Sequence, residues 1–402
     1  MKIRTLADAK KLSTATVLMR VDFNVPIEKG KIKEDFKIRQ SLADIHYCLA
    51  RANKLILMTH LGDPQGKRRL AYSTKPLAEH LAKILKLPIE FLDLKNNDSF
   101  KNAQQKINQA PKGTIFFLEN LRFFPGEANN DLRFAKQLAS LGDVYVNDAF
   151  AVSHRAAASV SGIKKYIKSY AGWLLSEEVE HLNKVLNPKK PLVVVIGGQK
   201  MNTKTKLISN LYRRADYLLI GGALANNFIL AQGYKVGKSL VDKDSITIAQ
   251  GLLKKAKSRR KHPEIITPID VIVKDTTAKK GKVAVNWRLV NKVGPKEMIG
   301  DLGPQTISLF AEYIKKANTI VWNGPLGKFE DSDFQKSTII IARLIASRSR
   351  GRAFGLAGGG ETVEALHLSK MGQYMDWVST AGGAMLAYLS GEKLPGLKGL
   401  IK

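Results

Sequence analysis

The chain has one cysteine, Cys48, so no disulfide can form within it and a reducing compartment fits. Its apolar runs, such as residues 192–196, have the length of strands, and none reaches the roughly 18 residues of a transmembrane helix. Charged residues interrupt the first eleven positions, which argues against a signal peptide. We therefore expect a cytoplasmic protein that has no membrane partner.

Several catalytic motifs are also missing. No Cys or His cluster has zinc spacing, there is no His-Glu-x-x-His, and no serine lies in Gly-x-Ser-x-Gly. The dinucleotide-binding fingerprint Gly-x-Gly-x-x-Gly is not completed, because Val363 stands where the third glycine would follow Gly358 and Gly360. Residues 233–239 resemble a P-loop with three spacers where four are needed, and no apolar strand precedes them, so we predict a loop there.

Acidic residues are few. Lys and Arg number 65 against 35 Asp and Glu, a net charge of +30. Such an excess suits a nucleic-acid binder, an enzyme that handles small anions, or simply a solvated surface. Aromatic residues make up only 7% and no basic tail is present, so we expect no nucleic-acid partner.

Strand-length apolar runs alternate with amphipathic helical stretches. In the first half the strands are predicted at residues 55–59, 114–118 and 144–146, and helices at 74–85 and 131–141. This alternation is typical of parallel βαβ units, so the sequence predicts the α/β class with mostly parallel sheets flanked by helices. With 402 residues, about two or three domains are expected. A charged helix at 176–186, stopped by Asn187-Pro188, marks the domain boundary.

In the second half, four predicted strands end in paired or tripled glycines followed by a helical stretch. The pairs begin at Gly197, Gly221, Gly358 and Gly382. Glycine at a strand-to-helix turn permits positive φ and lets backbone N–H groups approach a phosphate. Lys200 and Lys204 follow the first pair on one face of a helix. Four such turns indicate a nucleotide site.

Residues 17–26 read as a central strand with alternating faces. Arg20, Asp22 and Asn24 point one way and the apolar residues between them the other, and Pro26 ends the ladder. Buried polar groups need partners, and ligands of open α/β sheets bind at the carboxyl ends of the strands. We therefore predict a site at residues 20–24.

Basic side chains follow the other predicted strands of the first half. They are Arg39, His60, Arg122 and Arg155. Because the carboxyl ends of parallel strands share one edge, these residues should converge there. Several guanidinium groups at one edge make a pocket for a phosphate or a carboxylate.

A series of short motifs runs along the chain. They are Arg-Val-Asp-Phe-Asn-Val-Pro (20–26), His-Leu-Gly (60–62), Glu-Asn-Leu-Arg-Phe (119–123), Asn-Asp-Ala-Phe (147–150), His-Arg-Ala (154–156), Gly-Gly-x-Lys (197–200), Trp-Asn-Gly-Pro-Leu-Gly (322–327), Gly-Gly-Gly-Glu-Thr (358–362) and Ser-Thr-Ala-Gly-Gly-Ala (379–384). Taken in order, these motifs resemble those of the phosphoglycerate kinase family over essentially the whole chain.

The resemblance implies two Rossmann-like domains joined by an interdomain helix and hinge. Residues 1–175 would bind 3-phosphoglycerate or 1,3-bisphosphoglycerate, 176–188 would form the helix, and 189–385 would bind ATP or ADP with Mg²⁺. Residues 386–402 would return to the first domain. The implied reaction moves the acyl phosphate of 1,3-bisphosphoglycerate reversibly to ADP, and we expect a monomer. Because the carboxylate acceptor is ionised at neutral pH, no general base is needed.

The resemblance also implies roles for single residues. Arg39 and Lys200 would clamp the transferring phosphoryl group, with backbone donors at Gly359 and Gly382. The residues expected to bind the glycerate are Asp22, Phe23, Asn24, Arg39, His60, Leu61, Gly62, Asp63, Arg122 and Arg155. Those expected at the nucleotide are Gly198, Lys200, Lys204, Gly222, Glu330, Gly358, Gly359, Gly360, Glu361 and Thr362, with Glu361 on the magnesium ion.

This chain departs from the family pattern at five positions. Asp63 stands where an arginine is usual, Ala157 replaces a histidine, Glu361 an aspartate, Ala381 a glycine and Gln199 a small residue. Lys67, Arg68 and Arg69 follow Asp63 closely and could compensate for its charge. We expect the activity to be retained with altered substrate affinity.

Three other functions stay open at this stage. A nucleic-acid-binding protein would show a salt-dependent gel shift. Another doubly wound enzyme, such as a dehydrogenase, would bind nicotinamide nucleotides. An inactive relative kept for binding, which Asp63 suggests, would show no turnover.

Overall fold

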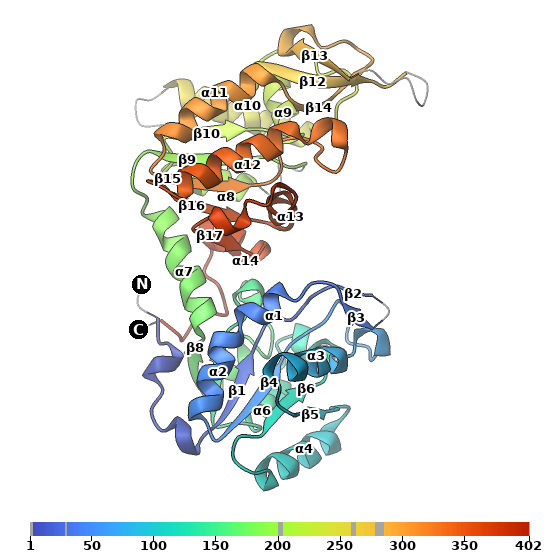
Figure 1. Ribbon diagram of the computed structural model, residues 1–402, viewed down its shortest axis with the longest axis vertical. Coiled ribbons are helices and arrows are strands. Elements are labelled where there is room, and N and C mark those ends of the chain that lie inside the picture. The colour runs from blue at the N-terminus through green and yellow to red at the C-terminus, as the bar shows by residue number, and fades with distance from the viewer. Residues whose placement is uncertain (1–2, 29, 200–203, 259–262, 278–284, 402) are drawn as a thin grey trace. The chain divides into compact units, whose positions relative to one another are not determined.

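The computed structural model describes residues 3–28, 30–199, 204–258, 263–277 and 285–401 (Figure 1). The chain divides into two compact units. The first unit comprises Met1–Glu180 with Lys393–Lys402, and the second unit comprises His181–Glu392. Helix α7 (Trp173–Leu186) contains the division, and it begins three residues before the predicted start at 176. Among the described helices, none is both long and apolar enough to cross a bilayer.

A parallel sheet forms the centre of the first unit, as the α/β prediction requires. Its described strands are, in spatial order, β5 (Ile89–Leu92), β6 (Ile115–Leu118), β4 (Lys54–Met58), β1 (Thr16–Arg20), β7 (Val144–Asn147) and β8 (Lys168–Ala171). A separate hairpin joins β2 (Ile27–Glu28) to β3 (Lys31–Ile32). The helices of this unit are α1 (Phe36–Gln40), α2 (Leu42–Arg51), α3 (Lys75–Leu85), α4 (Asn97–Gln109), α5 (Pro125–Ala128), α6 (Leu132–Ala139) and the start of α7.

The prediction of an alternating strand over residues 17–26 was wrong. Strand β1 ends at Arg20, and every side chain in it is buried. Val17 and Met19 pack in the core on the side of α2 and α3, whereas Leu18 packs with α4 and α6. A parallel sheet covered on both faces needs mostly apolar residues on both, and of the predicted polar row Arg20 lies within the ladder, at its end. Asp22 and Asn24 lie in the loop that follows it.

The second unit repeats this plan. Its parallel sheet has the order β11 (Glu264–Ile266), β10 (Tyr217–Ile220), β9 (Leu192–Ile196), β15 (Thr319–Asn323), β16 (Phe354–Gly358) and β17 (Trp377–Ser379) among the described strands. A small antiparallel sheet holds β13 (Val285–Leu289), β12 (Asp270–Asp275) and β14 (Glu297–Leu302). The helices are α8 (Thr205–Tyr212), α9 (Leu224–Ala231), α10 (Lys243–Ser258), α11 (Pro304–Lys316), α12 (Lys336–Ser349), α13 (Gly360–Ser369) and α14 (Gly383–Leu389). Residues 233–239 form the predicted loop, apart from one isolated bridge at Gly237.

The glycine turns of the second unit have the predicted backbone conformation. Gly198, Gly222, Gly359 and Gly382 have φ of +92°, +62°, +101° and +47°. At Gly222 a Cβ atom would lie 2.6 Å from the backbone nitrogen of Gly198, so a side chain would also clash there. These positions require glycine for their conformation, and Gly222 requires it for space as well.

Two buried carboxyl groups from other segments accept hydrogen bonds from the backbone at the start of α7. Asp44 accepts hydrogen bonds from the backbone nitrogens of Trp173 (2.7 Å) and Leu174 (3.3 Å), and Asp148 accepts one from Leu175 (3.3 Å). Asp148 Oδ2 has no hydrogen-bond partner among the described residues. Burial raises the pKa of Asp44 to about 6 and that of Asp148 well above its usual value, and the charge of Asp44 raises the pKa of Asp148 further.

The replacement Asp148→Asn should therefore stabilise the protein at high pH. A carboxyl group whose pKa is raised by folding stabilises the folded state at low pH, and this contribution is lost as the pH rises through its folded pKa. A pKa that differs by one between the folded and unfolded states changes the stability by about 1.4 kcal/mol. We expect the Tm of the wild type to fall between about pH 5 and pH 8, and that of Asp148→Asn to fall less, so that the variant is the more stable protein at pH 8.

Thermal unfolding followed by circular dichroism at both pH values measures this difference. Glu79→Gln, which neutralises an exposed carboxylate of the same unit, is the matched control and should leave the pH dependence of the wild type intact. A variant that loses stability equally at pH 5 and pH 8 would contradict the account.

Candidate active site

The first unit gathers cationic side chains in a pocket of about 570 Å³. Arg20 lies at the end of β1, Arg122 in the 3-10 turn Leu121–Phe123 after β6, and Arg155 in the segment after β7. All three line this pocket. Of the four basic residues that the sequence predicted to converge, Arg122 and Arg155 do so, whereas Arg39 and His60 are not among the lining residues. Asp63 also lines it.

The other arginines of this pocket, together with burial, destabilise the charge of Arg122. Burial lowers the pKa of Arg122, and the nearby charges of Arg155 and Arg20 lower it further, whereas Asp63 opposes the shift. One nitrogen of Arg122, Nη1, donates to the carbonyl oxygen of Gly62 at 2.7 Å, which fixes the guanidinium group. Because these charges repel, an anion that enters the pocket gains more than it would from one isolated arginine.

His60 lies against this cluster rather than in open solvent. Its side chain is 3% exposed, and its Nδ1 atom is 3.1 Å from Arg20 Nη2. Burial and then the charge of Arg20 hold the pKa of His60 well below its usual range, so the ring is neutral. Leu61, which follows it, is buried, and Gly62 adopts φ of +59°.

The loop after β1 contributes hydrogen-bonding groups. Burial opposes the ionised form of Asp22, but the Lys37 ammonium group at 2.9 Å and the other cationic groups nearby, Arg20 among them, together outweigh it, so the pKa of Asp22 is lowered. Asn24 Oδ1 accepts from the backbone nitrogen of Gly62 at 2.9 Å. The Phe23 side chain is fully buried and contacts the ring of Phe117, so it packs in the core. Sequence reasoning missed Lys37, although it precedes Arg39 by two residues in the same short helix.

Arg39 is exposed and makes its contact outside the arginine pocket. Its Nε atom forms a 2.8 Å ion pair with Asp35, which also pairs with His80 Nε2 at 3.0 Å. The guanidinium group is thus available at the surface of α1. Lys200, the predicted partner of Arg39, lies outside the described residues.

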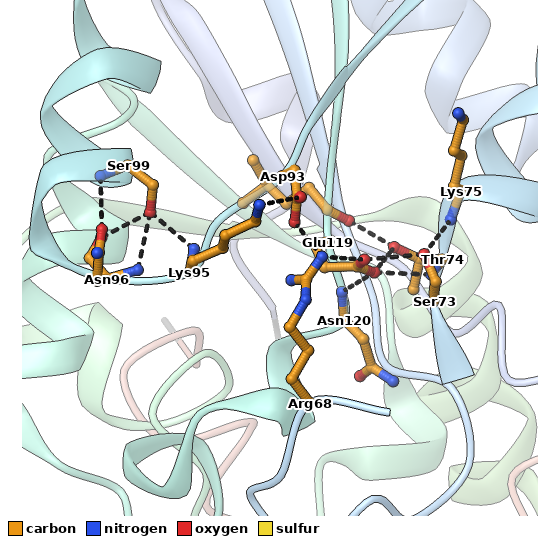
Figure 2. Close-up of polar contacts among 11 residues, drawn as sticks. Arg68, Ser73, Thr74, Lys75, Asp93, Lys95, Asn96, Ser99, Glu119 and Asn120 are labelled. Carbon is orange, nitrogen blue, oxygen red and sulfur yellow. Dashed lines mark hydrogen bonds and ion pairs between the residues drawn. The ribbon is translucent and has the colours of Figure 1, made fainter. Parts of the chain in front are cut away.

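Glu119 and Asn120, from the motif at 119–123, contact the segment that follows His60. Figure 2 shows Glu119 among the contacts that join it to Arg68, Ser73 and Thr74. Asn120 Nδ2 donates to the carbonyl oxygen of Leu61 at 2.7 Å. These bonds hold the segment from Leu61 to Thr74 in place.

The suggestion that Arg68 compensates for Asp63 finds no geometric support. Arg68 Nη2 pairs with Asp93 at 2.7 Å and lies 3.7 Å from Glu119, as Figure 2 shows. Lys67 and Arg69 are exposed, and neither lines the arginine pocket. The negative charge of Asp63 therefore stays at the pocket, where it acts on Arg122.

The second unit contains a separate pocket of about 240 Å³ at the glycine turns. Of the predicted nucleotide residues, Gly198, Gly222, Glu330 and Glu361 line it, beside apolar side chains such as Leu240 and Val271. Gly359 directly precedes α13, Gly360 begins this helix, and Thr362 is buried within it. Gly382 lies at the start of α14 and is not among the lining residues.

Lys204 lies beside this pocket, hydrogen-bonded through Nζ to Asn323 Oδ1. Burial lowers the pKa of Lys204 to about 8, and Glu361 partly offsets that shift. Asn323 Nδ2 in turn donates to the carbonyl oxygen of Gly358 at 2.5 Å, and Thr362 Oγ1 accepts from Gly324 N at 2.7 Å. The sequence pointed to the segment 322–327 as a motif but did not reveal that Asn323 holds Lys204.

No cluster of three or more His, Cys, Asp or Glu side chains suited to a metal ion occurs in the part of the chain that the structure describes. A magnesium ion that reaches a site with its nucleotide needs only one or two protein carboxylates. Glu361 lines the second pocket near the Gly198 turn and could serve as such a carboxylate.

Comparison with known proteins agrees with this arrangement. A family model described as phosphoglycerate kinase matches residues 6–392. The phosphoglycerate kinases of Pseudothermotoga lettingae and Chloroflexus aggregans are 42% and 40% identical, over 100% and 95% of this chain and 99% and 95% of their own.

Solved structures agree as well. The phosphoglycerate kinase from Coxiella burnetii superposes with a TM-score of 0.88 at 36% identity, over 99% of this chain and 98% of that one. The one from Pyrococcus horikoshii gives a TM-score of 0.81 at 29% identity over the same shares. The motifs, the two parallel-sheet units and these relatives together establish that the chain belongs to the phosphoglycerate kinase family.

Proposed function

We propose that the chain performs the reaction of its family, the reversible transfer of the acyl phosphate of 1,3-bisphosphoglycerate to ADP, and that the first unit holds the glycerate substrate. The observation that carries this proposal is the pocket in which Arg20, Arg122 and Arg155 meet at the carboxyl ends of β1, β6 and β7. A substrate with a phosphate group and a carboxylate matches several guanidinium groups that lack a full set of counter-ions.

The residues around the pocket divide the work of binding. Arg122 and Arg155 hold the distal phosphate of the glycerate. Asp22 and Asn24, whose side chains are fixed by Lys37 and Gly62, orient its hydroxyl and carboxyl groups. His60 donates a hydrogen bond to the same end of the substrate.

The nucleotide binds in the pocket of the second unit. The apolar lining takes the base, Glu330 contacts the ribose, and the phosphates lie at the glycine turns near Lys204 and Thr362. Positive φ at Gly198 and Gly359 turns backbone N–H groups toward bound anions. Glu361 holds the Mg²⁺ ion of the nucleotide, which supplies charge neutralisation to the phosphates when it is bound.

The chemistry needs positive charge rather than a proton acceptor. The carboxylate of 3-phosphoglycerate is ionised at neutral pH, since such groups have a reference pKa of about 3.5. Catalysis then consists of positioning, stabilising the charge on the transferring phosphoryl group and excluding water. Arg39 and Lys200 supply this charge, each from its own unit.

Because each unit holds one substrate, transfer requires that the units close around both. We assign the hinge to the helix region 176–188 and to Ser379–Thr380. A single chain supplies both sites, so the reaction needs no second copy.

Removing either charge of the clamp should abolish most of the turnover. We expect kcat to fall by about 10²- to 10³-fold in Arg39→Ala and in Lys200→Ala. Removal of one hydrogen-bond donor that stabilises the transition state has an effect of this size in other enzymes. A coupled assay of ATP- and 3-phosphoglycerate-dependent turnover measures this. Arg133→Ala, an exposed arginine on α6, should keep the wild-type rate. The clamp would be refuted by full activity in either variant.

Asp63 should weaken the binding of the glycerate substrate. The replacement Asp63→Arg removes a negative charge from the pocket and adds a phosphate ligand, so we expect the KM for 3-phosphoglycerate to fall about tenfold, or about 1.4 kcal/mol. Glu79→Arg makes the same change of charge on the exposed face of α3 and serves as the control. Equal KM values in wild type and Asp63→Arg would show that Asp63 does not act on the substrate.

Nucleotide binding should weaken at high pH. Since the pKa of Lys204 is lowered to about 8, its ammonium group is charged below that pH and loses its proton above it. We expect the KM for ATP to rise several-fold between pH 7 and pH 9 in the wild type and to stay nearly constant in Lys204→Arg, whose side chain remains protonated. Parallel pH profiles in the two proteins would rule out this role.

A further inference from the structure

Arg20 differs from the other arginines of the pocket because it is enclosed. Its side chain is 1% exposed, although it belongs to the pocket lining. Three of its donors are used inside the protein. Nε donates to Ser159 Oγ at 3.0 Å, Nη1 to the carbonyl oxygen of Val21 at 2.5 Å and Nη2 to His60 Nδ1 at 3.1 Å. A guanidinium group held at three points cannot swing outward to grip a ligand.

The far end of this contact chain is fixed by a buried carboxylate. Ser159 donates to Glu127 twice, from its hydroxyl group at 2.6 Å and from its backbone nitrogen at 2.9 Å. With its proton committed to Glu127, the Ser159 hydroxyl offers only lone pairs to Arg20 Nε. The planar guanidinium group is thereby locked in orientation, and so is the nitrogen that faces His60.

This geometry assigns the protons of His60. Arginine has donors only, so the nitrogen that faces Arg20 Nη2 must be the acceptor. Nδ1 therefore carries a lone pair, and the single proton of the neutral ring lies on Nε2. Burial and the positive charges of Arg20, Arg122 and Lys37 favour the neutral ring, whereas the carboxylate of Asp22 favours the charged ring. The neutral form prevails because the pKa of His60 is well below its usual value.

We propose that Arg20 is a positioning residue, which holds His60 as the neutral tautomer protonated on Nε2 and so makes it a constant hydrogen-bond donor to the glycerate substrate. The inference rests on the substrate role of His60 proposed above. A neutral donor gives direction to a carboxylate or hydroxyl group without adding a further charge to a cluster of arginines. Binding through His60 is then independent of pH across the range in which histidines usually titrate.

The tautomer can be observed without measuring activity. Long-range ¹H–¹⁵N spectra of the imidazole rings distinguish the two neutral forms and the charged form, and His60→Gln identifies the signals of His60. In the wild type we expect only the form protonated on Nε2 from pH 5.5 to pH 8. A proton on Nδ1, or titration near the usual histidine pKa, would overturn the inference whatever the activity.

Two variants test whether Arg20 is responsible. Arg20→Gln removes the charge and the donor. Ser159→Ala keeps the charge and removes the Nε anchor together with the hydroxyl bond to Glu127, and it guards against an Arg20 variant that fails to fold. We expect His60 to titrate in Arg20→Gln and to show a mixture of tautomers in Ser159→Ala. In Arg20→Gln the KM for 3-phosphoglycerate should change at least threefold between pH 5.5 and pH 8, while kcat at saturation varies less.

Arg20→Lys, which restores the charge and one donor, should bring the tautomer back in part, and the exposed Arg133→Gln should match the wild type. An unchanged tautomer in both Arg20→Gln and Ser159→Ala would overturn the role of Arg20. The proposed function fails separately, if the wild type shows no turnover or if His60→Gln binds 3-phosphoglycerate as well as the wild type does.

Discussion

The structure depends on the concentration of positive charge at the carboxyl ends of the strands of the first unit. Arg20 is fully enclosed, and Arg122 is partly buried beside it. A buried cation is costly unless it is paired and hydrogen-bonded. Asp22 and Glu127 supply part of the balance, and backbone carbonyls of Val21 and Gly62 supply more. The positive charge that these groups leave uncompensated favours the binding of an anion.

The rest of the first unit serves to keep these charges in place. Glu119 and Asn120 fix the segment that carries Gly62, and Ser159 fixes Arg20. None of these side chains needs to touch a substrate. They prevent the arginines from turning toward solvent, where water would weaken the attraction of each guanidinium group for an anion.

The second unit meets the same electrostatic demand by other means. Its glycine turns have positive φ, and Lys204 is hydrogen-bonded to Asn323 in a buried position that lowers its pKa. In the proposed reaction the carboxylate acceptor is already ionised, so neither unit would have to supply a general base.

Much of this arrangement could be predicted from the sequence, because it follows from local patterns. The strands at 55–59 and 193–196 and the turns at Gly359 and Gly382 were found within a residue or two, since apolar runs and glycines report on local backbone needs. The family followed from the motifs, and the meeting of Arg122 with Arg155 followed from the parallel strand order, whereas Arg39 and His60, predicted with them, do not line the pocket.

Contacts between distant segments could not be predicted in this way. The end of β1 at Arg20 depends on helices that cover both faces of the sheet, which a local alternation does not reveal. The partners of Arg20, 40 and 139 residues away at His60 and Ser159, have no signal in the sequence. The same holds for Asn323, 119 residues from Lys204, and for the Asp93 partner of Arg68.

The most direct test of the central claim is a titration of the wild-type protein with 3-phosphoglycerate, followed by NMR signals of histidine rings and arginine guanidinium groups. The account predicts that the signals of His60, Arg122 and Arg155 shift together with one dissociation constant, which weakens as salt is added. Shifts confined to other residues, or saturation that is insensitive to salt, would contradict the claim that buried positive charge in the first unit binds the substrate.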